Sequence, residues 1–133
     1  AEVISGFNKV RNHFGMSRIG QIGALAALLD TQWLPHVRAE IAKARTRIAG
    51  IAADNGLTVL PSATNFVAID CGRDGDFARA VLNHLVANGI FVRMPFTAPQ
   101  DRCIRVSCGT PAQMDAFAAV FPAALAAAHE KLG

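Results

Sequence analysis

An arginine in the middle of a short apolar segment is the residue of this sequence best placed to do chemistry. Residues 103–108 alternate in character, with Ile104 and Val106 on one face and Arg105 and Ser107 on the other. That alternation is typical of a strand with one buried face. A strand is rigid, and a guanidinium offers paired N–H donors that match the two oxygens of a carboxylate. The pattern therefore predicts a carboxylate-binding arginine on a strand.

A second arginine, Arg93, ends another apolar segment. For both Arg93 and Arg105, a purely structural role is an alternative to ligand binding. Arg93 closes the segment 90–93 and shares a face with Phe91, on whose ring it can stack instead of binding a ligand. For Arg105 the alternative is a solvated side chain or an ion pair with Asp70 or Asp101.

Composition favours a small-molecule site over a nucleic-acid site. The chain has 133 residues, is 52% hydrophobic and 17% charged, and carries a net charge of +3 from ten Arg, three Lys and ten acidic residues. No run of basic residues appears, which argues against nucleic-acid binding, whereas scattered arginines suit small anions. Cys71, Cys103 and Cys108 lack metal-ligand spacing and are predicted to be reduced, which favours a cytoplasmic protein without a metal. No segment has the length of a membrane span or the form of a signal peptide.

Apolar periodicity predicts an α+β domain. We expect helices at 1–13, 18–29, about twenty residues from Trp33 to Asn55, 74–88 and 111–129, and strands at 57–60, 65–70, 90–93 and 102–108. The order favours a small, largely antiparallel sheet covered by helices, a two-layer sandwich. The helix at 18–29 is rich in glycine and alanine, so we expect it to be buried between other elements.

Three segments resemble the C-terminal small domain of the fold-type I pyridoxal-phosphate aminotransferases, and histidinol-phosphate aminotransferases in particular. They are Asn65-Phe-Val, Asn88-Gly-Ile-Phe-Val-Arg and Ile104-Arg-Val-Ser-Cys-Gly-Thr, and the segment 7–17 lies at the matching place upstream. The resemblance implies that residues 1–30 are a helical connection to a large domain that this chain lacks. It also implies that residues 31–133 are the small domain.

The resemblance also implies site residues. Arg105 matches the family arginine that binds the substrate α-carboxylate, and Arg93 matches one that contacts a distal phosphate. Asn65 matches a position near the family's substrate-binding edge. Arg11 and His13 either line the site or cap a helix.

The cofactor implied is pyridoxal 5'-phosphate, held mainly by the missing domain. The three lysines, Lys9, Lys43 and Lys131, all fall on predicted helices, so no catalytic residue is assigned to this chain. The implied partners are an amino-acid or amino-phosphate substrate, a 2-oxo acid and a second subunit in a homodimer. Three alternatives remain open: a decarboxylase of the same fold, a stand-alone module that binds a small carboxylate or amino acid, and a dimerisation domain.

Overall fold

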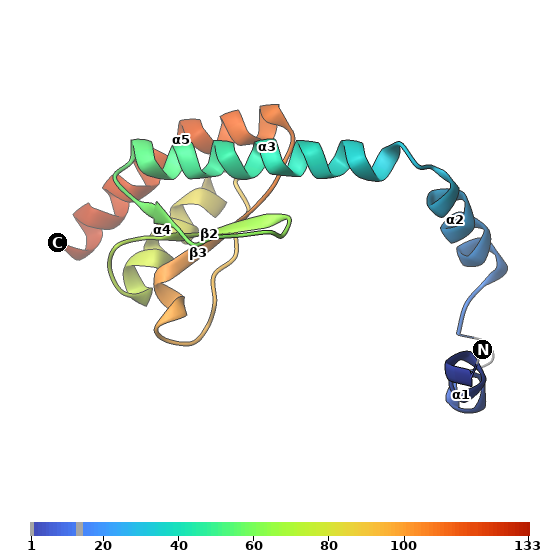
Figure 1. The fold of residues 1–133 in the computed structure, drawn as a ribbon. Coiled ribbons are helices and arrows are strands. Elements are labelled where there is room, and N and C mark those ends of the chain that lie inside the picture. The colour runs from blue at the N-terminus through green and yellow to red at the C-terminus, as the bar shows by residue number, and fades with distance from the viewer. Residues whose placement is uncertain (1, 13–14) are drawn as a thin grey trace. The chain divides into compact units, whose positions relative to one another are not determined.

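The computed structural model describes residues 2–12 and 15–133, which divide into two compact units. One unit runs to His36 and the other from Val37 to Gly133. The second unit holds the whole β-sheet and three of the helices (Figure 1).

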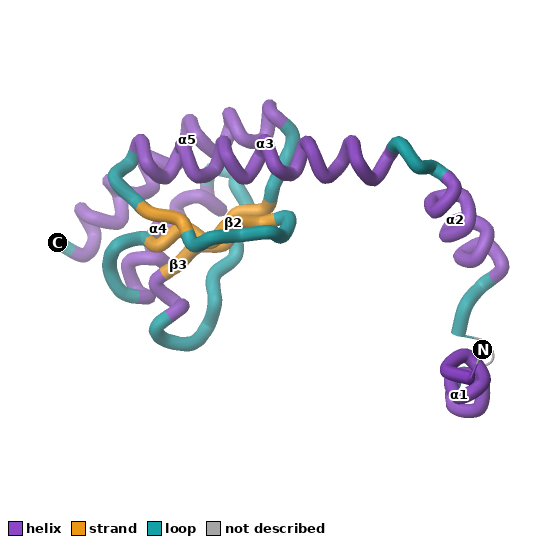
Figure 2. The backbone as a smooth tube through the Cα atoms, in the orientation of Figure 1, coloured by secondary structure: helices purple, strands orange, loops and turns teal. Residues whose placement is uncertain are grey.

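A three-stranded antiparallel sheet forms one layer of the second unit. The strands β1 (Thr58–Val59), β2 (Phe66–Asp70) and β3 (Cys103–Ser107) lie in the order β1-β2-β3. Figure 2 shows them as the short orange segments among the helices. In the register of β2 and β3, Arg105 lies opposite Ala68 and Ile104 opposite Ile69.

Helices supply the other layer and most of the core. They are α3 (Trp33–Asp54), α4 (Gly75–Ala87) and α5 (Pro111–Leu132), with a 3-10 turn, η1 (Gln100–Arg102), before β3. Their buried faces meet one face of the sheet, and the largest fully buried side chains are Phe77, Phe117, Phe121, Ile48, Ile69, Leu85, Ile104 and Val81. The predicted two-layer α+β fold is therefore confirmed.

Local signals in the sequence fix where these helices begin and end. The Asp74 side chain accepts from the N–H of Phe77, and Thr110 and Gln113 form a reciprocal capping box at the start of α5. At the other ends, Gly56 and Gly89 adopt positive φ angles of 72° and 79°, which only glycine adopts at little cost.

The strand expected at 90–93 is wrong, because the structure has only an isolated bridge there, between Arg93 and Arg105. The N–H of Ile90 is already used: it donates to the carbonyl of Leu85 and closes α4. Two residues after Arg93, Pro95 has no N–H to extend the pairing. The segment between α4 and η1 is therefore a loop that touches the sheet at one residue.

The N-terminal unit has helices but no core. It contains α1 (Glu2–Val10), α2 (Arg18–Leu29) and the first turn of α3, and none of its described residues is buried in this chain. The expected burial of the 18–29 helix is therefore not found. Large apolar side chains stand exposed along both helices: Val3, Ile4, Phe7, Val10, Ile19, Ile22, Leu25, Leu28 and Leu29.

Candidate anion-binding site

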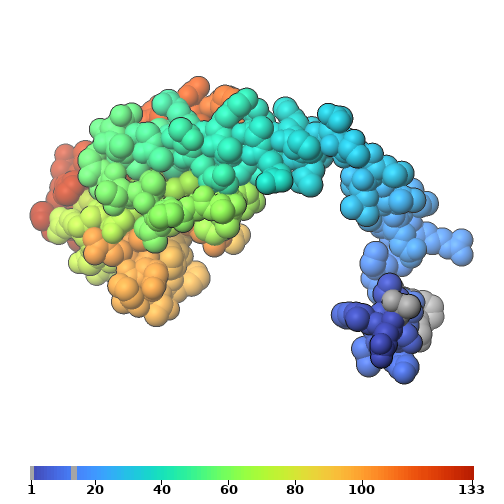
Figure 3. Space-filling model, viewed as in Figure 1, coloured from blue at the N-terminus to red at the C-terminus, as the bar shows by residue number. Residues whose placement is uncertain are grey.

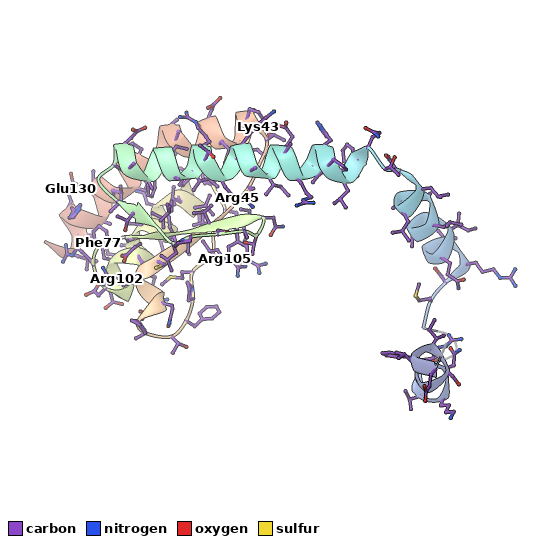
Figure 4. All side chains as sticks on the ribbon, viewed as in Figure 1. Lys43, Arg45, Phe77, Arg102, Arg105 and Glu130 are labelled. Carbon is purple, nitrogen blue, oxygen red and sulfur yellow. The ribbon has the colours of Figure 1, made fainter. Side chains whose placement is uncertain are left out.

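Arg105 projects from the middle of β3, on the sheet face opposite the core. Its neighbours Ile104 and Val106 are buried, so strand alternation directs Arg105 the other way. The side chain is half-buried, and its guanidinium carbon lies 4.6 Å from the centre of the Phe66 ring. Figure 4 shows Arg105 at the sheet. The strand and the ring together restrict the guanidinium to a small region.

Two reciprocal backbone hydrogen bonds hold Arg93 directly opposite Arg105. The N–H of Arg105 donates to the carbonyl of Arg93 (2.6 Å), and the N–H of Arg93 donates to the carbonyl of Arg105 (3.2 Å). Directly opposed residues in an antiparallel pair present their side chains on the same face. The Arg93 guanidinium lies 5.9 Å from the centre of the Phe91 ring, as the stacking alternative predicts. That contact leaves the Arg93 side chain exposed.

A hollow of about 690 Å³ brings the two arginines together with a third. We call it the arginine-lined hollow; it is formed by Arg79, Leu82, Asn83, Phe91, Val92, Arg93, Met94, Pro95, Phe96 and Arg105. All ten residues belong to the second unit, and none is acidic. Figure 3 shows the neighbouring segment around residue 100 (orange) projecting from this unit. The lining of the hollow thus combines three arginines with apolar residues that include Phe91 and Phe96.

Asp70 and Asp101, the carboxylates considered as partners of Arg105, form no ion pair with it. Asp70 accepts from the Nε of Arg102 at 2.8 Å, so the ion pair considered for Arg105 is formed by a neighbouring arginine instead. Within residues 2–12 and 15–133, neither Arg105 nor Arg93 makes an ion pair. Both guanidiniums therefore keep N–H donors for an anionic ligand.

Asn65 lies just before β2 and does not line the arginine-lined hollow. Its carbonyl accepts from the N–H of Cys108 (2.8 Å), and its side chain is exposed. The preceding turn is held by Arg45 of α3, which donates to the carbonyl of Thr64 at 2.9 Å and is labelled in Figure 4. The structure thus groups two of the three predicted binding residues and leaves Asn65 apart from them.

The cysteines do not contribute a nucleophile. All three are free, and Cys71 and Cys103 are buried. Burial raises the pKa of the Cys71 thiol to about 12, and burial also raises the pKa of the Cys103 and Cys108 thiols. Such thiols are protonated and unreactive at neutral pH. The described residues contain no cluster of side chains that could hold a metal ion.

None of the residues that line the hollow is a lysine. Lys43 pairs with Glu40 on the exposed side of α3 (2.7 Å). Lys9 is in the last turn of α1 and Lys131 in that of α5, both exposed. Arg11 donates to the Asn8 side chain, while His13 lies outside the described residues.

Sequence reasoning missed Arg79 and Asn83, which α4 adds to the hollow. Their separation of four residues places them on one helix face, and this spacing was the available signal. Neither residue belongs to a segment of family resemblance, so nothing in the sequence linked α4 to Arg93 and Arg105. None of the described helices is long and apolar enough to cross a membrane.

Comparisons with known proteins identify relatives of the chain. The family model for aminotransferase class I and II matches residues 1–121. The chain is 34% identical over 116 residues to histidinol-phosphate aminotransferase of Rhodospirillum centenum, and 32% identical over 119 residues to that of Clostridium acetobutylicum. Each match covers 87% of this chain, but only 32% and 33% of the relatives.

A solved structure gives the same result. The histidinol-phosphate aminotransferase of Sinorhizobium meliloti, in complex with pyridoxal-5'-phosphate, superposes with a TM-score of 0.87 and 52% sequence identity. The match covers 94% of this chain and 34% of that protein. The chain thus spans about a third of the length of its relatives. By this match of model, sequence and fold, the chain belongs to the aminotransferase class I and II family.

Proposed function

We propose that this chain is the C-terminal part of a pyridoxal-phosphate-dependent aminotransferase of the histidinol-phosphate aminotransferase type. The substrates would be an amino phosphate or amino acid and a 2-oxo acid. Family membership supports the reaction class. The observation that carries the proposal is Arg105, a guanidinium fixed on a strand, without an ion pair among the described residues, in a recess beside Arg93.

The role proposed for Arg105 is to bind the substrate carboxylate and fix its orientation. Pyridoxal phosphate, when bound in the parent enzyme, supplies the electron sink for amino-group transfer. Arg105 contributes positioning: a two-pronged contact from a rigid strand restricts rotation of the bound carboxylate and therefore of the carbon next to it. The Phe66 ring under the guanidinium limits the rotamers of Arg105 before substrate binds.

The remaining assignments are proposals on the same basis. Arg93 would contact the distal phosphate of an amino-phosphate substrate, and Asn65 would lie at the substrate-binding edge. The parent enzyme would be a cytoplasmic homodimer, with the missing domain holding most of the cofactor.

Substitution of Arg105 in the full-length enzyme tests the proposal. We expect Arg105→Ala to raise KM and to lower kcat, with kcat/KM falling by roughly 10- to 1,000-fold, since a charge-assisted, two-pronged contact and its orienting effect are both lost. Arg105→Lys should recover only a small part, because an ammonium cannot make the two-pronged contact. Steady-state kinetics of amino-group transfer measure both effects.

Arg38→Ala is the matched control. Arg38 is exposed on α3, makes no ion pair among the described residues and does not line the hollow. Its loss should leave kcat/KM within about twofold, as for other surface substitutions. Normal kinetics for Arg105→Ala would contradict the carboxylate role.

A module that binds a small carboxylate without catalysis is the second candidate. One observation favours it. Every residue that lines the arginine-lined hollow belongs to the second unit, and none of these lining residues is a lysine. Amino-group transfer by the full-length protein would exclude this candidate. Release of CO2 without amino-group transfer would instead identify a decarboxylase of the same fold.

A further inference from the structure

We propose that Arg45 of α3 is a positioning residue for Arg105, acting through the turn 61–65 and the ring of Phe66. The inference rests on the proposed function and deepens it, because it concerns how the carboxylate-binding guanidinium is held before the substrate arrives. In this arrangement Phe66 restricts the Arg105 side chain, and Arg45 restricts the turn from which Phe66 follows.

The register of the sheet makes the Phe66 ring the support of the Arg105 side chain. Alternation along β2 turns Phe66 and Ala68 to the face opposite the core, which is also the face of Arg105. Ala68 lies directly opposite Arg105, but its methyl group is too short to cover a guanidinium. Phe66 lies opposite Ser107, in the diagonal position that long and aromatic side chains reach across a strand pair. The ring centre accordingly lies 4.6 Å from the guanidinium carbon of Arg105.

An aromatic ring can hold this guanidinium without competing with the substrate. Within the part of the chain that the structure describes, the Arg105 side chain forms neither an ion pair nor a hydrogen bond. A carboxylate partner would occupy the same N–H donors that a substrate carboxylate needs. A ring attracts the positive charge and leaves those donors available. The contact with Phe66 therefore suits an arginine that must be fixed in place and still bind an anion.

Hydroxyl groups of the turn hold the backbone of Phe66. The Ser62 hydroxyl donates to the Phe66 carbonyl at 2.6 Å, and the Thr64 hydroxyl donates to the same carbonyl at 3.2 Å. The N–H of Phe66 donates in turn to the Thr64 hydroxyl oxygen at 3.4 Å. Both peptide groups of Phe66 are thus tied to the turn, so the position of the turn decides where the ring lies.

Arg45 connects this turn to α3. Its Nη1 donates to the carbonyl of Thr64 at 2.9 Å, across nineteen residues of sequence. Arg45 and Arg105 are both labelled in Figure 4. Arg45 is half-buried, and Ala44 and Ile48 beside it on α3 are buried in the core, so the helix is a rigid support. A hydrogen bond from a charged donor is roughly twice as strong as a neutral one. Loss of this contact should therefore loosen the turn and the ring that follows it.

Kinetics of the full-length enzyme with glutamate as amino donor test the inference. We expect Phe66→Leu to lower kcat/KM by about 3- to 30-fold, the equivalent of one cation–π contact. Phe66→Tyr should stay within about threefold, because the ring remains. Arg45→Gln should cause a smaller loss, about 2- to 10-fold, since a loosened turn still brings the ring to the guanidinium part of the time. Unchanged kinetics in Arg45→Gln would overturn the proposal.

A double-mutant cycle separates positioning from a general structural effect. In an Arg105→Ala background, Phe66→Leu and Arg45→Gln should each change kcat/KM less than about twofold further, because no guanidinium is left to position. Losses that add to that of Arg105→Ala would contradict the proposal. Arg47→Gln is the matched control. It breaks a contact of the same helix, with Asp115 at 3.3 Å, and should change kcat/KM less than about twofold.

A binding measurement on the 133-residue chain separates this inference from the proposed function. The Nε–H signal of Arg105 is followed by NMR while acetate is added. Phe66→Leu should remove the ring-current shift of this signal and weaken acetate binding about 3- to 30-fold. Arg45→Gln should move the signal part of the way, and Arg47→Gln should leave it in place.

The two failures are then distinct. If the Arg105 signal and acetate binding respond as expected but the full-length enzyme transfers no amino group, the proposed function fails and the positioning role stands. If amino-group transfer occurs and Arg45→Gln leaves both the signal and acetate binding unchanged, the positioning role of Arg45 is wrong.

Discussion

The two units of this chain contain similar apolar residues and use them in opposite ways. Phe121 of α5 is fully buried (0% exposed) in a core shared by three helices and the sheet, whereas Phe7 of α1 is 64% exposed. The same contrast separates Ile48 of α3 from Ile22 of α2, which are 0% and 69% exposed. Apolar periodicity alone therefore does not create a core, because the apolar face of a helix must also have a second apolar surface to pack against.

Helix formation itself is equally well signalled in both units. Ser17 caps α2 by accepting from the N–H of Gly20 (3.0 Å), and Thr110 caps α5 by accepting from the N–H of Gln113. Short helices are marginal without tertiary packing, however, because most helical stability in proteins comes from the buried face. We therefore expect α3 to α5 to unfold cooperatively with the sheet, and α1 and α2 to make little contribution to that transition.

A matched pair of phenylalanine substitutions gives the largest expected effect. Phe121→Ala should lower the free energy of unfolding by about 3–5 kcal/mol, because it removes buried surface and leaves a cavity. Phe7→Ala should change it by less than about 0.5 kcal/mol, as for other exposed positions. Chemical denaturation of the 133-residue chain measures both. Similar losses from the two variants would show that α1 belongs to the cooperative core.

Much of the fold could be predicted because its signals are local. Asp74, the Thr110-Pro111 pair and the Asn88-Gly89 pair mark helix ends through contacts within a few residues, and all three are confirmed. The prediction of a strand at 90–93 was wrong because Ile90 has β-forming character, whereas its N–H donates to the carbonyl of Leu85 and closes α4. The predicted burial of α2 was not found, because small residues permit another element to pack closely but do not themselves provide that element.

The candidate site shows the same limit. Alternation along β3 was sufficient to predict that Arg105 faces away from the core. The presence of Arg79 in the same hollow depends on how α4 packs against the sheet and on the course of the loop 91–96, and neither follows from residue spacing. Asn65 was selected by resemblance to a family segment, and its part in binding stays a prediction.

Alkaline pH should weaken the core unit through Cys71, an effect of intermediate size. Burial raises the pKa of the Cys71 thiol from 9.0 to about 12 in the folded chain. Between these values the folded chain keeps a proton that the unfolded chain has lost, so stability present below pH 9 is lost as the pH rises toward 12. The loss is about 1.4 kcal/mol per pH unit. The free energy of unfolding measured between pH 9 and 11 should fall with at least this slope, because burial also raises the pKa of the Cys103 and Cys108 thiols, and Cys71→Ala should reduce the slope. Equal slopes in both proteins would contradict the assignment.

Two helix caps provide the finest test of the difference between the units. Thr110→Ala removes the capping box of α5 and should cost about 1 kcal/mol of the free energy of unfolding, the usual value for such a cap. Ser17→Ala removes an equivalent hydrogen bond from α2, but its cost should be confined to the local helix–coil equilibrium, since α2 buries no residue in this chain. Denaturation midpoints should therefore respond only to Thr110→Ala, whereas amide exchange should accelerate in α2 of Ser17→Ala. A shift in the global midpoint of Ser17→Ala comparable to that of Thr110→Ala would mean that α2 is coupled to the core, and the two units would then unfold as one.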